Sequence, residues 1–317
     1  MESKAQINTA AGDPEPPILH IGVNVVGYIV LIILGALAAI IVSRALKTKK
    51  EKAQELQRQQ EQAEKEAQAA VLRAEREELE RQQALEFSQA LESIPAVEIS
   101  VADTPVKKRN MYELDDVSFS NITKKTPRDK LGNFVAVDVE TTGLSQVSDE
   151  IIEVAAIRFR EFKPVEKFAT LCAPKKGIDE AAARVNGITA DMVEDKPLFG
   201  QIAPALQEFI GKDNVVGHNL DFDLRFLCKH GVDFTAEKHR YYDTLEIAQR
   251  TLKKVKKKYD RDLEAYVEDY FSDYDVDDYK LGTLCEYYKI PFFGSHRAIA
   301  DCYVTGLLLE RLAWDRE

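Results

Sequence analysis

The sequence is poor in cysteine. Its 317 residues contain four cysteines, and no two of them form a C-x-x-C pair: Cys172, Cys228, Cys285 and Cys302. Disulfide scaffolds need a denser, paired set of cysteines, and zinc sites usually need closely spaced cysteine or histidine ligands. The scarcity argues against both classes and predicts reduced thiols in a cytoplasm-like compartment.

An excess of basic residues is also absent. The chain has 43 Lys and Arg against 54 Asp and Glu, which gives a formal net charge of -11. This balance argues against a protein that tracks nucleic acid through a broadly basic surface. It leaves open an acidic site that acts on nucleic acid with metal ions.

No charged residue occurs between Ile21 and Val42. A helix of this length spans roughly 33 Å, enough to cross a hydrocarbon core of about 30 Å. Five basic residues follow, whereas Lys4 alone precedes: Arg44, Lys47, Lys49, Lys50 and Lys52. We therefore expect residues 18–43 to form one transmembrane helix, with residues 21–42 in the lipid bilayer. The positive-inside rule places the N-terminus outside and the rest of the chain in the cytoplasm.

Two alternatives to this anchor are less consistent with the sequence. A cleaved signal peptide would have a shorter apolar stretch and a more basic start. A buried helix of a soluble protein would not be apolar on every face over this length. The single-span anchor is the prediction, and the polar residues 1–17 before it are expected to be a disordered tail.

Glycine and proline are both missing between Gly35 and Pro95. The intervening residues are rich in Glu, Gln, Ala, Lys and Arg, which predicts a long helix over residues 44–94. Apolar residues recur every seven positions only in part, so a solvated stalk is favoured over a self-associating coiled coil. Prolines at 95, 105 and 127 then indicate a linker over residues 95–130.

Two acidic side chains stand out in the apolar stretch of residues 134–140. At a strand's period of two, Asp138 and Glu140 lie on one face, and Thr141-Thr142-Gly143 ends the strand. A carboxylate pair on a buried strand is costly unless a cation lies nearby. Oxygen ligands suit Mg²⁺ or Mn²⁺, so we expect a metal site. An exposed pair on an edge strand is the alternative.

Further acidic residues occur after later predicted elements. Strands are expected at 151–157, 168–171 and 215–216. A short helix is expected from Ala181 to near Gly187, another after Thr189 as its cap, and a longer one at 202–210. Asn219 is then expected to cap a helix whose first turn carries Asp221 and Asp223, although acidic residues there often only complement the helix dipole. Near the C-terminus, His296 is expected in a loop and Asp301 in the helix that follows.

Three motifs occur in order: Asp138-x-Glu140-Thr-Thr-Gly, His218-Asn-x-x-Phe-Asp223 and His296-x4-Asp301. Together they resemble the DEDDh group of DnaQ-like 3′→5′ exonucleases, over about residues 131–315. The resemblance implies an α/β fold, an RNase H-like exonuclease domain over residues 131–317 with a central mixed β-sheet flanked by helices. Asn186 stands where the family more often has histidine, a departure that we do not expect to affect the chemistry.

The resemblance also implies roles for individual residues. His296 would be the general base, and histidine titrates near neutral pH, which suits proton transfer. The backbone of Thr141 and Thr142 and the ring of Phe222 would contact the terminal nucleotide, whereas Asp243 would be structural. Four carboxylates would hold two divalent metal ions, Mg²⁺ or Mn²⁺: Asp138, Glu140, Asp223 and Asp301.

The implied substrate is the 3′ end of single-stranded DNA or RNA, and the implied products are nucleoside 5′-monophosphates. Two other functions remain open. One is an inactive, membrane-tethered module that binds nucleic acid or acts as a scaffold. The other is a metal-dependent phosphodiesterase for small nucleotides.

Residues 253–279 form an insertion with lysines at its start and many acidic residues after them. Tyrosines recur at helical spacing, which predicts an amphipathic helix whose tyrosines pack on the domain while its charges face water. Alternatively, the lysines guide a single strand toward the site and a tyrosine stacks on a base.

Overall fold

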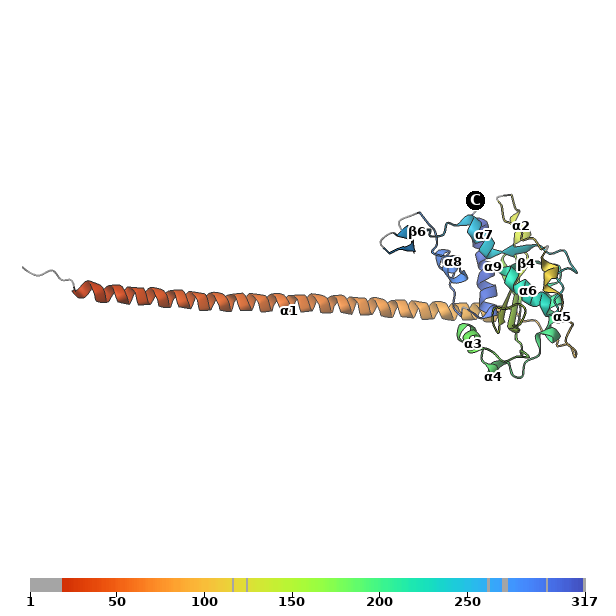
Figure 1. Ribbon diagram of the computed structural model, residues 1–317, viewed down its shortest axis with the longest axis horizontal. Coiled ribbons are helices and arrows are strands. Elements are labelled where there is room, and N and C mark those ends of the chain that lie inside the picture. The colour runs from red at the N-terminus through yellow and green to blue at the C-terminus, as the bar shows by residue number, and fades with distance from the viewer. Residues whose placement is uncertain are drawn as a thin grey trace, which may run out of the picture. The chain divides into compact units, whose positions relative to one another are not determined.

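The computed structural model describes residues 19–315 except 116, 124, 261–262, 270–272 and 295. The predicted tail, residues 1–17, lies outside the described residues. The chain divides into two compact units, Met1–Glu78 and Leu79–Glu317 (Figure 1). Each unit is described by itself.

The first unit consists of most of helix α1, which spans Leu19–Ser93 and has 75 residues. The predicted transmembrane and stalk helices are therefore one continuous helix, because no glycine or proline interrupts it after Gly35. Along the polar part, side-chain amides donate to glutamates four residues on, such as Gln57 to Glu61 at 3.0 Å. The apolar part is exposed and, by length and composition only, long enough to cross a membrane.

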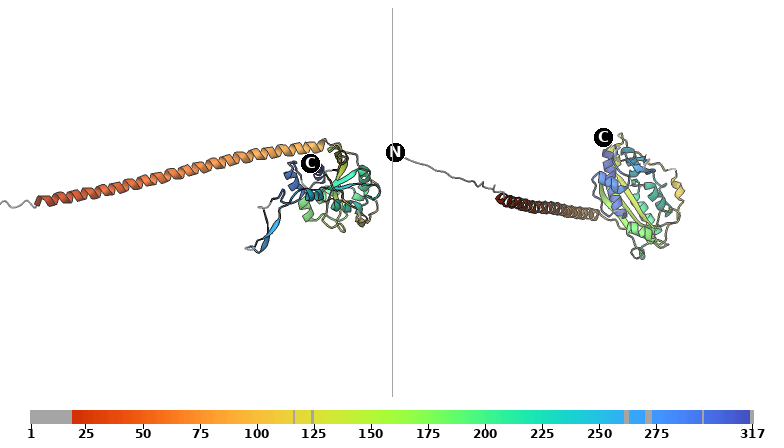
Figure 2. Two further views of the ribbon diagram at one scale, coloured as in Figure 1. Left: turned by 90° about the horizontal axis from the view of Figure 1, so that it is seen from above. Right: turned by 60° about the vertical axis from the view of Figure 1, so that its left-hand side comes forward.

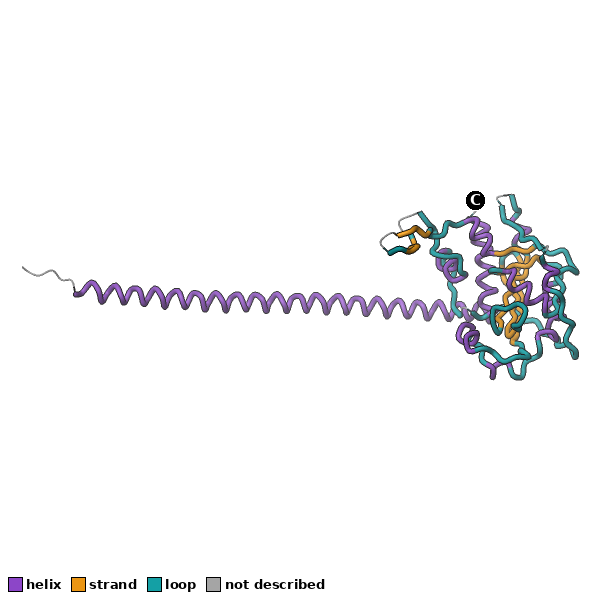
Figure 3. The backbone as a smooth tube through the Cα atoms, viewed as in Figure 1, coloured by secondary structure: helices purple, strands orange, loops and turns teal. Residues whose placement is uncertain are grey.

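The second unit contains a five-stranded mixed sheet, which confirms the predicted sheet type (Figure 3). The strand order is β3-β2-β1-β4-β5; β2 is antiparallel to β1 and β3, and β4 is parallel to β1 and β5. Apolar residues on both faces of β1 explain its central place. The strands are β1 (Phe134–Thr141), β2 (Ile151–Arg160), β3 (Lys163–Leu171), β4 (Asn214–Gly217) and β5 (Tyr241–Asp243).

Helices cover both faces of the sheet. Phe134 and Ala136 pack in one core cluster with residues of α7, α8 and α9, whereas Val135 and Val137 pack on the other face with residues of α5 and α6. Asp138 and Glu140 share the face of Phe134, so they lie toward α9. The helices of this unit are α2 (Arg128–Leu131), α3 (Glu180–Asn186), α4 (Ala190–Val193), α5 (Phe199–Ile210), α6 (Leu220–Lys229), α7 (Thr244–Thr251), α8 (Leu281–Tyr287) and α9 (Ala298–Trp314), with a 3₁₀ turn at Met111–Leu114.

The segment expected to be a linker packs against the domain. Leu114 and Ile122 are buried in its core. The segment also forms a β-bridge between Phe119 and Tyr241, at the edge of the sheet. Scattered apolar residues between the prolines account for this difference, because each finds an apolar surface on the domain. Most described residues of 95–130 are exposed, as expected of a linker, but Leu114 and Ile122 attach this segment to the domain.

This packing predicts that a fragment of residues 128–317 is less stable than one of residues 79–317. The shorter fragment lacks Phe87, Ile94, Leu114 and Ile122, all buried here. Burial of one large apolar side chain contributes about 1.5–3 kcal/mol, so we expect a loss of at least about 3 kcal/mol. Urea unfolding measures the difference, and equal stability of the two fragments would contradict the packing.

The insertion does not form the predicted helix. Residues Lys257–Asp260 (β6) and Ala265–Glu268 (β7) form an antiparallel hairpin that extends from the rest of this unit (Figure 2). Tyr259 and Tyr266 pair across it with ring centroids 5.3 Å apart and are 54% and 71% exposed. They therefore pack on each other and not on the domain. A spacing of seven residues fits one face of a helix and also fits a pair across a hairpin, which explains why a helix was predicted. Tyr270 lies outside the described residues.

Candidate active site

The predicted catalytic residues lie where the parallel strands end. Asp138 and Glu140 are near the end of β1, and Asp223 is in the first turn of α6, which follows β4. His296 and Asp301 lie just before and within the start of α9. The carboxyl ends of parallel strands are the usual place for a site in such folds.

The structure brings these five side chains into one region. Possible ligand atoms of Glu140, His296 and Asp301 all lie within 4.8 Å of one another. Asp138 lines a cavity of about 540 Å³ together with His296 and Asp301. Asp223 is more deeply buried, and its Oδ1 accepts a hydrogen bond from the backbone N–H of Val139 at 3.1 Å.

Burial and mutual repulsion raise the pKa values of these carboxyl groups. Burial, followed by the charges of Asp223, Asp301 and Glu140, raises the pKa of Asp138 well above its ordinary value. Burial likewise raises the pKa of Asp223, against a hydrogen bond from Val139 that lowers it. Burial is also the main cause that raises the pKa of Glu140 to about 8 and that of Asp301 to about 7.

These residues fit divalent cations. Oδ1 of Asp301 is buried and has no hydrogen-bond partner among the described residues. An unpaired buried carboxylate oxygen is costly, and a cation would offset both that cost and the repulsion among the four acids. Hard cations with oxygen ligands, such as Mg²⁺ and Mn²⁺, match this set of donors.

The residues predicted to contact the substrate do not line the cavity beside the acidic residues. Thr141, Thr142 and Phe222 are not among the described residues that line the cavity. Oγ1 of Thr141 donates to the carbonyl of Gly143 at 2.6 Å, and Oγ1 of Thr142 accepts from the N–H of Glu150 at 3.1 Å. Both side chains thus hold the loop after β1, while the ring of Phe222 packs on that of Phe226 at 4.9 Å. Their contacts with substrate remain predictions.

Asn219 occupies the N-cap position of α6, as expected, but its side chain does not cap the helix. It adopts a left-handed backbone with φ 63°, and its side chain makes no capping hydrogen bond. The carboxylate of Asp243 accepts instead from the N–H groups of Asn219 at 2.9 Å and Leu220 at 3.0 Å, and also from Leu245 at 2.9 Å. One carboxylate therefore caps both α6 and α7, which supports the structural role predicted for Asp243.

Asn186 is part of the site, and the expectation that its departure from histidine does not affect the chemistry stays a prediction. Its side chain hydrogen-bonds Glu140 and lowers the pKa of that carboxyl group, against the larger effect of burial. Its amide also approaches the carbonyl of Thr141 at 3.5 Å. The departure from histidine therefore touches a predicted metal ligand, which the sequence pattern alone could not reveal.

Sequence reasoning assigned no role to most other residues that line the cavity. Several of them come from the segment after the insertion, which carries no motif. The residues are His218, Asn219, Lys280, Leu281, Gly282, Thr283 and Phe292. Of these, only His218 and Asn219 were part of a motif. Their place beside Asp223 in that motif was the one signal in the sequence that could have assigned them to the site.

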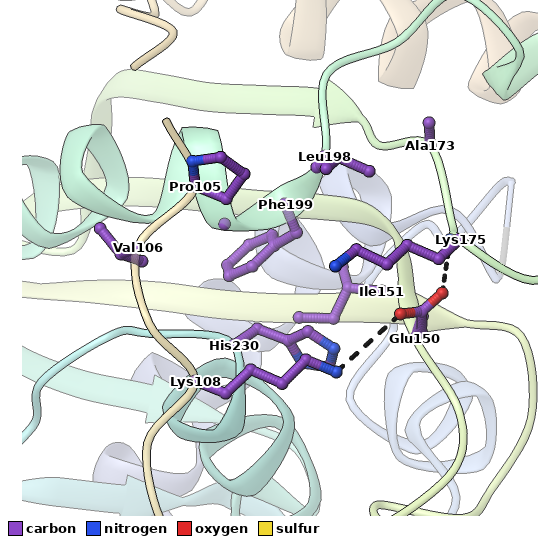
Figure 4. A pocket seen from close by; sticks show the side chains of 11 residues that line it. Pro105, Val106, Lys108, Glu150, Ile151, Ala173, Lys175, Leu198, Phe199 and His230 are labelled. Carbon is purple, nitrogen blue, oxygen red and sulfur yellow. Dashed lines mark hydrogen bonds and ion pairs between the residues drawn. The ribbon is translucent and has the colours of Figure 1, made fainter. Parts of the chain in front are cut away.

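A second pocket lies between residues 105–108 and the domain (Figure 4). Nζ of Lys108 is 4.0 Å from Oε1 of Glu150, and the N–H of Lys175 donates to the same carboxylate at 2.5 Å. None of the five predicted catalytic residues lines this pocket. This pocket lies in the contact between the segment before β1 and the rest of the domain.

The profile of the exonuclease family matches residues 135–309. The chain belongs to this family, and the match spans all three motifs and the whole site. This membership confirms the prediction of an enzyme of the 3′→5′ exonuclease class.

The chain is also similar to individual proteins. The DNA polymerase III subunit epsilon of Aquifex aeolicus is 30% identical over 182 residues, which cover 56% of this chain and 80% of that protein. A PolC-type DNA polymerase III of Oceanobacillus iheyensis is 33% identical over 181 residues, which cover 56% of this chain but 11% of that protein. The solved structure of exonuclease X in complex with 5′-overhanging duplex DNA is 26% identical, with a TM-score of 0.41, and covers 56% of this chain and 90% of that one.

Proposed function

We propose that the protein is a membrane-anchored, metal-dependent exonuclease that shortens single-stranded DNA or RNA from the 3′ end and releases nucleoside 5′-monophosphates. The observation that carries this proposal is the convergence of Glu140, His296 and Asp301 within 4.8 Å, with Asp138 in the same cavity. Asp223, which is more deeply buried, adds a fourth carboxyl group. Such a group of acids has a clear use in binding cations beside a phosphodiester.

Each side chain has a part in the proposed reaction. Asp138, Glu140, Asp223 and Asp301 would hold two divalent ions, which would supply stabilisation of the charge that develops on the attacking and leaving oxygens. His296 lies exposed at the mouth of the cavity, where it accepts the proton of the attacking water. The backbone of Thr141 and Thr142 and the ring of Phe222 contact the terminal nucleotide.

The nuclease proposal is tested with linear and circular single strands of the same sequence. Full-length protein in detergent, supplied with Mg²⁺ or Mn²⁺, is expected to degrade the linear strand alone and to release nucleoside 5′-monophosphates. EDTA is expected to stop the reaction. Cutting of the circular strand would contradict exonuclease action, and hydrolysis of dinucleotides alone would favour a small-nucleotide phosphodiesterase.

We further propose that residues 21–42 span a membrane, with the N-terminus outside and the exonuclease domain in the cytoplasm. The exposed apolar part of α1 and the basic residues after it support this proposal. Replacing Leu34 and Leu37 by lysine is expected to move the protein from the membrane fraction to the soluble fraction. Self-association through the stalk stays a prediction.

A further inference from the structure

Glu153 is a buried carboxylate next to the proposed site, with no part in the reaction described above. It lies on β2 directly opposite Glu140 on β1, and it is 5% exposed. A buried charge beside other acids is strongly destabilising unless it is paired. The residue that pairs with Glu153 therefore matters for the structure of the site.

Arg297 pairs with Glu153 through two guanidinium nitrogens. Its Nη2 donates to Oε1 at 2.7 Å, and its Nε lies 3.1 Å from Oε2. This forked contact fixes both groups in a plane, which a lysine could not do. The two residues are 144 positions apart in the chain.

Glu153 also fixes the start of α9. Its Oε2 accepts from the backbone N–H of Ala298, the first residue of that helix, at 3.0 Å. The residue at the N-cap position, Arg297, makes no side-chain capping bond. A carboxylate from a neighbouring strand thus replaces a local cap, so that β2 anchors the backbone of Arg297 and Ala298.

His296 needs such an anchor. It has φ 62°, a left-handed backbone that costs a residue with a side chain on the order of 1 kcal/mol or more. Its ring is exposed, so packing does not set the ring's direction. The backbone decides from where the side chain extends, and it is held on one side by a hydrogen bond from the N–H of His296 to Asp301 and on the other by Arg297.

We propose that Arg297, held by Glu153, is a positioning residue that keeps the left-handed backbone of His296 in place and so holds its imidazole over the cavity. The inference rests on the proposed role of His296 as the base. Arg297 itself contacts neither substrate nor metal in this account. Its effect on catalysis passes through His296.

Two conservative variants of the full-length protein in detergent test the pair. Arg297→Lys keeps the charge and loses the fork, whereas Glu153→Gln keeps the shape and an acceptor for Ala298. Either change is expected to lower kcat by about 10–100-fold, the range for supporting contacts around a site, with KM and Mn²⁺ affinity near those of the wild type. Arg250→Lys, in the exposed pair with Glu246 on α7, is the matched control and is expected to leave kcat unchanged. A loss of Mn²⁺ affinity that matches the loss of kcat would overturn the proposal.

A double-mutant cycle with His296→Ala separates positioning from a general structural effect. If Arg297 acts through His296, adding Arg297→Lys to His296→Ala lowers kcat no further. Additive losses would overturn the positioning role and leave the proposed function intact. A His296→Ala protein as active as the wild type would instead remove the base assignment, and the positioning role with it.

Discussion

Asp138→Asn is expected to lower the rate of strand hydrolysis by at least about 10²–10³-fold, the effect of removing one electrostatic group from a preorganised site. The substitution keeps the size of the side chain and removes its charge. Asp138 lines the cavity and interacts with four other acidic side chains, so the variant is also expected to bind Mn²⁺ more weakly. Mn²⁺ titration followed by electron paramagnetic resonance measures the binding, and labelled strands measure the rate.

Asp221→Asn provides the matched control for this loss. Asp221 lies in the first turn of α6, two residues before Asp223, and its carboxylate pairs with Arg225 at 2.8 Å near the surface. Asp221→Asn removes one negative charge from the helix that also carries Asp223. This charge lies outside the cavity, so its loss tests for a general effect of charge. We expect near wild-type hydrolysis from Asp221→Asn, and a strong loss there, or none in Asp138→Asn, would contradict the assigned site.

The metal-free protein is expected to lose stability as the pH rises from 5.5 to 8.5. The folded-state pKa of Glu140 is about 8 and that of Asp301 about 7, both above the ordinary values of 4.5 and 3.8. The folded protein therefore binds more protons than the unfolded chain. The stability from these groups is fully present below pH 4 and is lost as the pH rises through 7 and 8.

The size of this loss is expected to be on the order of 5 kcal/mol, because each pH unit over which a group releases its proton only in the unfolded chain contributes up to about 1.4 kcal/mol. The single tryptophan, Trp314 in α9, reports unfolding of the catalytic unit by fluorescence in urea. Mg²⁺ or Mn²⁺ is expected to restore stability at pH 8.5 more than at pH 5.5, because cations bind the deprotonated acids.

Glu140→Gln is the control for the pH effect, because the amide does not titrate. The variant is expected to be more stable than the wild type at pH 8.5 in EDTA, and its stability is expected to fall less with pH. A metal-free wild type whose stability does not change between pH 5.5 and 8.5 would contradict the raised pKa values.

Local sequence patterns were sufficient to predict the core of the fold. The alternation along residues 134–140 predicted the two faces of β1 correctly, because the period of a strand is a backbone property. Asp138 and Glu140 could be singled out from the sequence, since carboxylates are rare on an apolar strand, whereas Asp223 and Asp301 were assigned through the motif resemblance. The sheet order and the partners of these acids were not predictable, because they depend on pairings between distant segments.

The errors arose where one spacing fits two structures or where distant residues decide. Tyr259 and Tyr266 fit a helix face by spacing, yet they form a cross-strand pair. Asn219 has the residue type of a cap, but Asp243 supplies the carboxylate from another strand. No local pattern could connect Glu153 with Arg297, because their contact exists only in the folded domain.

The most direct test of the central claim is the direction of digestion. Single-stranded DNA and RNA, each labelled at the 5′ end or at the 3′ end, are incubated with the full-length protein and Mg²⁺ or Mn²⁺, beside Asp138→Asn. We predict a descending ladder from the 5′-labelled strand and immediate release of labelled mononucleotide from the 3′-labelled strand, both lost in the variant. Release of the 5′ label first, or intact strands that the protein binds but does not cut with either metal, would contradict a 3′→5′ exonuclease.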